Sequence, residues 1–219
     1  MLDFIGVFQG VEFFIVSAAF ILVILFSLTI HEFAHSYIAY TQGDVTSKYF
    51  GRMSLNPAKH IDPMGFICLL LFGFGWAKPV PINSVKFKNY RKGLFLTSIA
   101  GVCANIIATF VFSGLFILYT NLNTAIVSYF ETFVYYLLYF GVSINLGLAI
   151  FNLLPIPPLD GFNVIASFTK GTNKFVEFLR KYSFVILLAF LILGWIDIIF
   201  DIVFSFVLPA FYDFWQFIF

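Results

Sequence analysis

Long apolar stretches, separated by short polar or proline-rich segments, dominate the chain. Apolar runs cover residues 11–38, roughly 94–118, 132–154 and 183–205. A helix needs about 20 predominantly apolar residues to cross a bilayer, and each of these runs is long enough. The pattern therefore predicts an α-helical polytopic membrane protein with about four transmembrane helices, forming a single integral-membrane domain over residues 1–219.

Residues 43–92 depart from this pattern. They contain nine glycine and proline residues, short strand-like pieces such as SKYFGRMSL and KPVPIN, and one apolar piece, MGFICLLLFGFGW. The apolar piece is too short to span, which indicates a re-entrant or interfacial element. Irregular backbone at membrane depth is tolerated only where it is buried in protein or lines a wet cavity. The segment therefore predicts a cavity near one face of the membrane.

The distribution of charge adds a topology. All twelve Lys and Arg residues fall within residues 48–92 and 170–181. The positive-inside rule places both windows in the cytoplasm, so residues 93–169 must leave and return, and both termini lie outside. The C-terminal FYDFWQFIF is expected to lie in the outer interface as an aromatic anchor. The N-terminal sequence has no basic region, so a cleavable signal peptide is not expected.

Composition agrees with a membrane protein, because 61% of the residues are hydrophobic and 11% are charged. Soluble domains are about half apolar and a quarter charged. A net charge of +1 gives no reason to expect a nucleic-acid partner. Cys68 and Cys103 lack CxxC spacing and lie in apolar surroundings, so they are expected to be buried small hydrophobic residues.

The motif HEFAH at residues 31–35 lies near the end of the first apolar run. His31 and His35 are four residues apart, so on a helix both imidazoles can reach one Zn²⁺ ion, while Glu32 lies beside the metal and can act as a general base. Ionisable groups inside a span cost about 2.5–3.5 kcal/mol each on insertion scales, which makes them candidates for function. The third histidine, His60, is expected to be a loop residue. The motif predicts one zinc ion per chain.

A catalytic zinc needs a third protein ligand and an open position. Asp160 is the favoured carboxylate, because it follows an apolar span that Pro155, Pro157 and Pro158 interrupt. Asn152 lies eight residues before Asp160, and it either hydrogen-bonds a substrate carbonyl or oxyanion or joins two helices. The other acids on the same predicted side resemble turn or solvated residues: Asp44, Asp62 and Glu177.

Taken together, these motifs resemble those of the site-2 proteases, the intramembrane zinc metalloproteases of peptidase family M50, and most of all the minimal prokaryotic members without PDZ or CBS domains. HEFAH matches the family's HExxH, GVCAN at 101–105 matches its GxxxN, and NLLPIPPLDG at 152–161 matches its C-terminal motif. Val102 stands where the family often has proline. GDVTSKYFGRMSLNPAKHIDPMG and FGWAKPVPIN are also similar to the family's connecting segment.

The resemblance implies that His31, His35 and Asp160 bind zinc, that Glu32 is the catalytic base, and that Asn152 positions the substrate. It also implies that the segment after HExxH forms a membrane-inserted β-sheet that pairs with an extended substrate. The expected activity is hydrolysis of peptide bonds in or near transmembrane segments of membrane proteins that another protease has already cut. The expected location is a prokaryotic cell membrane, with the site near the cytoplasmic face.

Two rival functions fit parts of the pattern. A catalytically inactive pseudoprotease would bind transmembrane helices without cutting them, and the intact HExxH and Asp160 oppose this. A transporter would also use broken helices with polar groups at membrane depth, but the chain has no inverted repeat. Metal content and single-turnover cleavage distinguish the first rival, and flux assays distinguish the second.

Overall fold

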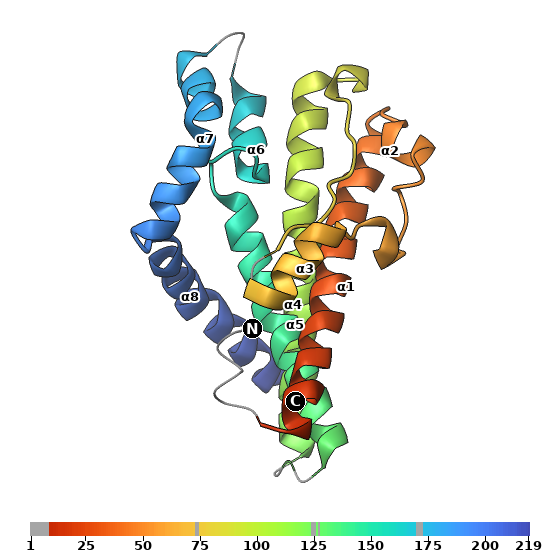
Figure 1. Ribbon diagram of the computed structural model, residues 1–219, viewed down its shortest axis with the longest axis vertical. Coiled ribbons are helices and arrows are strands. Elements are labelled where there is room, and N and C mark those ends of the chain that lie inside the picture. The colour runs from red at the N-terminus through yellow and green to blue at the C-terminus, as the bar shows by residue number, and fades with distance from the viewer. Residues whose placement is uncertain (1–8, 73–74, 124–125, 127, 170–172) are drawn as a thin grey trace.

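The computed structural model describes residues 9–72, 75–123, 126, 128–169 and 173–219. This part of the chain is mostly helical, and three long helices lie side by side along the long axis of the molecule: α1, α4 and α5 (Figure 1). The elements in chain order are α1 (Val11–Thr41), α2 (Thr46–Tyr49), η2 (Pro57–Lys59), α3 (Pro63–Phe72), η3 (Ser84–Lys86), α4 (Tyr90–Leu122), α5 (Tyr129–Leu153), α6 (Asp160–Phe168), α7 (Lys174–Ile192) and α8 (Trp195–Ile218).

Within the described residues, four helices are long and apolar enough to cross a membrane: α1, α4, α5 and α8. This confirms the predicted class, a polytopic helical membrane protein. Apolar packing joins α1 and α5, since Val16, Val23 and the small Ala19 of α1 pack on Phe140 of α5. Small residues at such interfaces let backbones approach closely in a bilayer, where no hydrophobic force drives helices together.

The predicted boundaries of the fourth span, residues 183–205, are wrong. A turn at Gly194, which has a φ of +67°, separates α7 from α8, and the apolar helix long enough to cross is Trp195–Ile218. Glycine adopts this left-handed conformation without the Cβ penalty of other residues. Residues 211–218 of the C-terminal FYDFWQFIF therefore continue α8, and the Trp215 indole N–H donates to the carbonyl of Phe110 in α4 at 3.0 Å.

The predicted β-sheet in residues 43–92 is not found in the described part of that segment, where only one isolated bridge occurs, between Ile61 and Ala77. Asn56 and Asn83 cap short 3₁₀ turns, and the apolar piece forms α3. Prolines at 79 and 81 have no N–H group, so the extended piece around them cannot complete a ladder. The segment is an irregular connection with one short helix.

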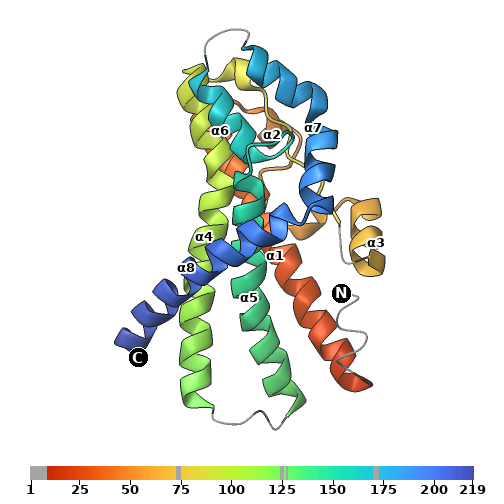
Figure 2. The same ribbon diagram turned by 90° about the vertical axis from the view of Figure 1, so that its left-hand side faces the viewer.

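The apolar helix α3 lies beside α1, on the N-terminal side of the HEFAH motif. A pocket between them is lined by Leu25 and Leu28 of α1 and by Phe66 and Leu69 of α3, among others. Figure 2 shows α3 beside the middle of the bundle rather than at its end. With 10 residues, α3 is too short to span, as predicted, and its re-entrant or interfacial position stays a prediction.

Both basic windows reach the same end of the bundle. The short helix α2, the start of α4 and the start of α7 lie at the upper end in Figure 1. The end of α4 and the start of α5 lie at the opposite end. This arrangement agrees with a shared side for the two windows.

The two cysteines are not both buried as expected. Cys103 of α4 is exposed and Cys68 of α3 is half-buried, so that expectation is wrong. Cys103 follows two buried residues, Gly101 and Val102, but lies on the outer side of the helix. An apolar neighbourhood in the sequence of a membrane helix does not separate the side that faces protein from the side that faces lipid.

Candidate metal centre

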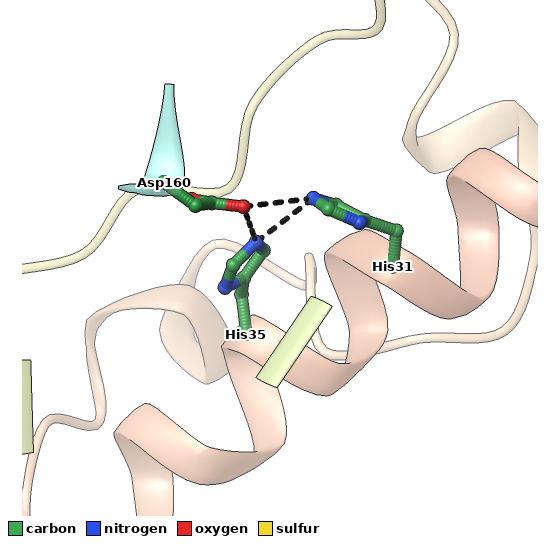
Figure 3. A group of neighbouring side chains, drawn as sticks. All are labelled: His31, His35 and Asp160. Atoms are coloured by element: carbon green, nitrogen blue, oxygen red, sulfur yellow. Dashed lines mark hydrogen bonds and ion pairs between the residues drawn. The ribbon is translucent and has the colours of Figure 1, made fainter. Parts of the chain in front are cut away.

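Three predicted side chains meet between α1 and α6. His31 and His35 project from consecutive turns of α1 toward Asp160, the first residue of α6 (Figure 3). The two Nε2 atoms lie 3.0 Å apart, and Asp160 Oδ2 lies 3.0 Å from His35 Nε2 and 3.2 Å from His31 Nε2. In a tetrahedral zinc site with bonds of about 2.0–2.1 Å, neighbouring ligand atoms are about 3.3 Å apart. The three atoms are therefore arranged to hold one zinc ion after small adjustments.

Both imidazoles are held from their other nitrogen. His35 Nδ1 lies 2.6 Å from the carbonyl oxygen of Thr97, and His31 Nδ1 lies 2.6 Å from Asn105 Oδ1. Because a carbonyl oxygen only accepts, His35 Nδ1 carries the proton and its Nε2 keeps a lone pair for a metal. Metal-binding histidines commonly have such a partner, which sets the ring orientation and tautomer.

Gly101 of α4 makes this approach possible. A Cβ atom at this position would lie 2.5 Å from His35 Nε2 and 2.6 Å from both Cε1 and Nε2 of His31. Any other residue would therefore collide with the ligand atoms or push α4 away from α1. The glycine and the asparagine of GVCAN thus have separate tasks, since Gly101 leaves room for the rings and Asn105 holds one of them.

Asp160 reaches the histidines because the chain turns sharply after α5. The residues between α5 and α6 fill the interior with Ile156 and Leu159, and Gly161 packs so closely on the carbonyl of Leu153 that a Cβ would collide with it. Burial raises the pKa of Asp160, but its close contacts with the two histidine rings outweigh this and lower the pKa to about 2. The carboxylate is thus ionised at neutral pH, which is the form that binds a metal.

Glu32 faces a different partner. Its Oε2 accepts a hydrogen bond of 2.9 Å from the backbone N–H of Val80. The chain before Val80 is itself held by buried Arg52, whose Nη2 donates to the carbonyl of Lys78 at 2.5 Å and to that of Pro79 at 3.4 Å. Glu32 is half-buried, directly follows His31 on α1, and has one oxygen anchored.

Asn152 is not part of the cluster in this structure. Its Nδ2 donates to the carbonyl of Leu148, one turn back on α5, at 3.0 Å. His60 is a buried loop residue, as predicted, and its Nε2 lies 2.7 Å from the carbonyl oxygen of Ser54. The structure thus places neither side chain among the ligand atoms.

The acids that were not favoured as ligands also have other tasks. Asp44 accepts hydrogen bonds from the backbone of Asn83 and Thr46, and Asp62 accepts one from the N–H of Gly65 at the start of α3. Burial raises the pKa of Asp44, but the hydrogen bonds from Asn83 and Thr46 lower it below the usual range. The remaining acid, Glu177, is exposed on α7.

The partners of the two histidines are residues that the sequence did not single out. Asn105 appears there only as the last position of a matching motif, and Thr97 not at all. An asparagine within an apolar helix is a usable sequence signal for a functional or helix-joining residue, because a polar group inside a span needs a partner. For Thr97 the sequence holds no signal, since its backbone carbonyl makes the contact.

Comparison with known proteins points to one family of metalloproteases. The family model for peptidase family M50 matches residues 124–194. Curated relatives named "Putative zinc metalloprotease" include YwhC of Bacillus subtilis, 39% identical over 77% of this chain and 78% of the relative. Rip2 of Mycolicibacterium smegmatis is 28% identical over 79% and 67%, and MJ0611 of Methanocaldococcus jannaschii is 32% identical over 47% and 49%. No solved structure is significantly similar.

The apolar helices and the zinc-metalloprotease relatives together indicate a multi-pass membrane metalloprotease. The similarity to YwhC, which covers more than two thirds of both chains, shows that the chain belongs to peptidase family M50. It is accordingly a zinc metalloendopeptidase.

Proposed function

We propose that this chain is an intramembrane endopeptidase that hydrolyses peptide bonds in or near transmembrane segments of other membrane proteins. One observation carries the proposal, namely that the ligand atoms of His31, His35 and Asp160 converge within 3.2 Å. Two of them lie on α1, a helix long and apolar enough to cross the membrane. Placing histidines inside a span costs insertion free energy. This cost is expected if the peptide bond that is cut also lies in the membrane.

Each residue of the cluster has a role in this proposal. His31 Nε2, His35 Nε2 and Asp160 Oδ2 would hold the zinc. Zinc supplies Lewis-acid polarisation of the scissile carbonyl and lowers the pKa of water. Glu32 takes a proton from the attacking water and can return it to the leaving amine. The Val80 N–H fixes Oε2, and the second carboxylate oxygen is left for the proton transfer.

Asn152 remains a prediction as the residue that holds the substrate carbonyl. Its amide has two N–H bonds, of which one goes to Leu148, so the other can donate to a substrate. Asn152→Ala should weaken cleavage while leaving the zinc content unchanged. A variant with wild-type kinetics would exclude this role.

A transmembrane helix must unwind before its peptide bonds can be cut. The unwound substrate segment is proposed to lie along the extended residues 76–83. Val80 of this piece contacts Glu32, and its prolines exclude a helix, which supports an extended neighbour beside the base. An extended substrate in hydrocarbon needs partners for its backbone groups. Cysteines in residues 76–83 should cross-link to a trapped substrate with a two-residue alternation. Cross-links with a three-to-four-residue period would contradict this arrangement.

The site is proposed to face the cytoplasm in a prokaryotic cell membrane. Support comes from the two basic windows, which share one end of the bundle. Cysteine labelling tests the orientation. Thr124 and Thr172, the loop positions that the charge pattern suggests for it, lie outside the described residues, so their neighbours Asn123 and Asn173 are used.

In a background without the two native cysteines, Asn173→Cys should be labelled only from inside and Asn123→Cys from outside. Asn173 lies at the start of α7, and Asn123 lies at the end of α4. The reverse labelling pattern would overturn the orientation.

The substrate is proposed to be a membrane protein that another protease has already shortened. Membrane fragments should be compared by proteomics between cells with the wild-type protein and cells with Glu32→Gln. Fragments that depend on Glu32 identify the substrates. If the purified protein holds zinc but cells show no fragment that depends on Glu32, the pseudoprotease function replaces the proposed one.

A further inference from the structure

A chain of buried amide side chains crosses three helices and ends on His31. His31 Nδ1 lies 2.6 Å from Asn105 Oδ1, Asn105 Nδ2 donates to Asn145 Oδ1 at 2.8 Å, and Asn145 Nδ2 donates to the carbonyl of Gly141 at 2.8 Å. Asn105 Nδ2 also lies 3.3 Å from the carbonyl of Ser27. Both asparagine side chains are fully buried. Asn145 lies on α5 and is not itself bonded to a histidine.

The direction of this chain is set at its two backbone ends. A carbonyl oxygen only accepts, so Asn145 must present its NH₂ group to Gly141 and its oxygen to Asn105. Asn105 then presents its NH₂ group to Asn145 and Ser27, and its oxygen to His31. His31 Nδ1 must therefore donate, and the lone pair of its ring lies on Nε2, which faces the other two ligand atoms.

We propose that Asn145 is a positioning residue of the metal centre, which through its shorter hydrogen bond, together with the carbonyl of Ser27, fixes the amide of Asn105 and through it the tautomer of His31. If the Asn105 amide turned over, its oxygen would face the oxygens of Asn145 and Ser27, and two buried contacts would join acceptor to acceptor. The proposal rests on the proposed role of His31 as a zinc ligand.

The second histidine supplies an internal comparison. His35 Nδ1 bonds directly to the backbone carbonyl of Thr97, so no side chain decides its tautomer. A change at Asn145 should thus alter His31 and leave His35 as it is. The chain contains only three histidines, so ring-nitrogen NMR signals can be assigned one by one.

The experiment uses three variants at one position, Asn145. In Asn145→Ser the hydroxyl can bond one turn back, as Ser143 does to Tyr139, but it is too short to reach Asn105. Asn145→Leu removes the acceptor with a similar volume. Asn145→Asp keeps an oxygen toward Asn105 whether or not the buried carboxyl is protonated.

A fourth variant, Ser113→Ala, is the control. Ser113 is a fully buried polar residue of α4 whose hydroxyl bonds one turn back, to the carbonyl of Phe110 in the same helix. Its loss therefore removes a buried hydrogen bond from α4 without touching the chain of amides.

Two measurements test the proposal on the full-length protein in detergent. ¹⁵N NMR of metal-free protein with labelled histidine, at a pH well above the ordinary imidazole pKa of about 6.5, reports the tautomer of each ring. Titration with Co²⁺ against a chelator reports metal affinity. We expect Asn145→Ser and Asn145→Leu to give mixed tautomers at His31 alone and about tenfold weaker Co²⁺ binding. Asn145→Asp and Ser113→Ala should resemble the wild type in both measurements.

Unchanged His31 signals and Co²⁺ affinity in Asn145→Ser would overturn the proposal. So would an equal loss of affinity in Ser113→Ala, because that outcome means general loosening of the helices. Serine already occurs in this helix at position 143, so Asn145→Ser decides the matter even if Asn145→Leu does not fold. Failure of the proposed zinc site can be told apart from failure of this proposal. If His31 is not a metal ligand, His31→Ala leaves Co²⁺ binding unchanged, whereas the NMR spectra of the Asn145 variants still report the tautomer of His31.

Discussion

The metal centre and the C-terminal helix α8 are attached to the rest of the molecule in opposite ways. Around the centre, polar side chains and backbone carbonyls make specific hydrogen bonds between helices, and Gly101 brings the helices close together. Along α8, which the structure describes from end to end, the contacts are mostly aromatic and aliphatic, and Ile196 is the one buried residue. Only 6% of the apolar window of α8 is buried, compared with 44% for α4.

The attachment of α8 is concentrated near its ends. Ile196 packs with Leu154 and Ile156 at one end, and Trp215 contacts α4 at the other. Between these points an apolar cleft separates α8 from α4 and α5, lined among others by Ile106 and Phe206. Hydrogen bonds fix directions, whereas apolar contacts tolerate sliding. The comparison suggests that α8 can shift without moving a zinc ligand, and the following predictions test each half of that statement.

Loss of a ligand should have the largest effect. The wild-type protein should contain about one equivalent of zinc, and Asp160→Ala should lose most of it together with detectable proteolysis, because a catalytic zinc site needs three protein ligands. Metal analysis of the purified protein measures this. The control is Asp62→Ala, which removes a carboxylate that bonds the N–H of Gly65 and should keep its zinc. A full zinc load in Asp160→Ala would remove Asp160 from the ligand set.

Replacing the base should separate chemistry from metal binding. Glu32→Gln should keep the zinc and lose activity by about 10²–10⁴-fold, since the amide cannot take a proton. The oxygen of the new side-chain amide can still accept a hydrogen bond from the Val80 N–H, so the local fold should persist. Metal content and cleavage of one substrate are measured on the same sample. Turnover close to that of the wild type would exclude Glu32 as the base.

Filling the space at Gly101 should give an intermediate effect. Gly101→Ala places a methyl group against both histidine rings, so zinc affinity should fall about 10–100-fold, as when the support of a metal ligand is disturbed. Gly147→Ala is the matched control, because its methyl group would lie 3.6 Å from Phe200 of α8, an ordinary contact. Competition with a chelator measures both. Equal affinities in the two variants would show that close approach of α4 is not needed.

Part of the metal centre and of the fold was predictable from the sequence. The spacing of His31 and His35 places both on one side of a helix, and the proline-broken helix before Asp160 pointed to the carboxylate that lies beside them. Both signals are local, and the structure brings the three residues together. The first three spans were also predictable, because length and apolarity suffice to identify them.

The rest depends on how helices are placed against each other. Asn105 meets His31, and Asn145 meets Asn105, only through the register of three helices, which no spacing along one helix encodes. The end of α7 before Gly194 lies inside a continuous apolar run, where hydropathy gives no boundary. The expected β-sheet was wrong because strand-like composition in KPVPIN also suits an extended piece without a ladder.

The smallest predicted effect concerns the far end of α8. Trp215→Phe keeps an aromatic ring against Phe110 but loses the indole hydrogen bond to its carbonyl, a net loss of about 0.5–1.5 kcal/mol. Amide exchange in the last turns of α8 should therefore speed up by about 2–10-fold, with no change in zinc content. The control is Trp195→Phe. Trp195 begins α8 and its ring packs on Phe190 of α7, so this variant should leave amide exchange in the last turns of α8 unchanged. If Trp215→Phe instead releases zinc, the two regions are coupled, and the independence of α8 from the metal centre is wrong.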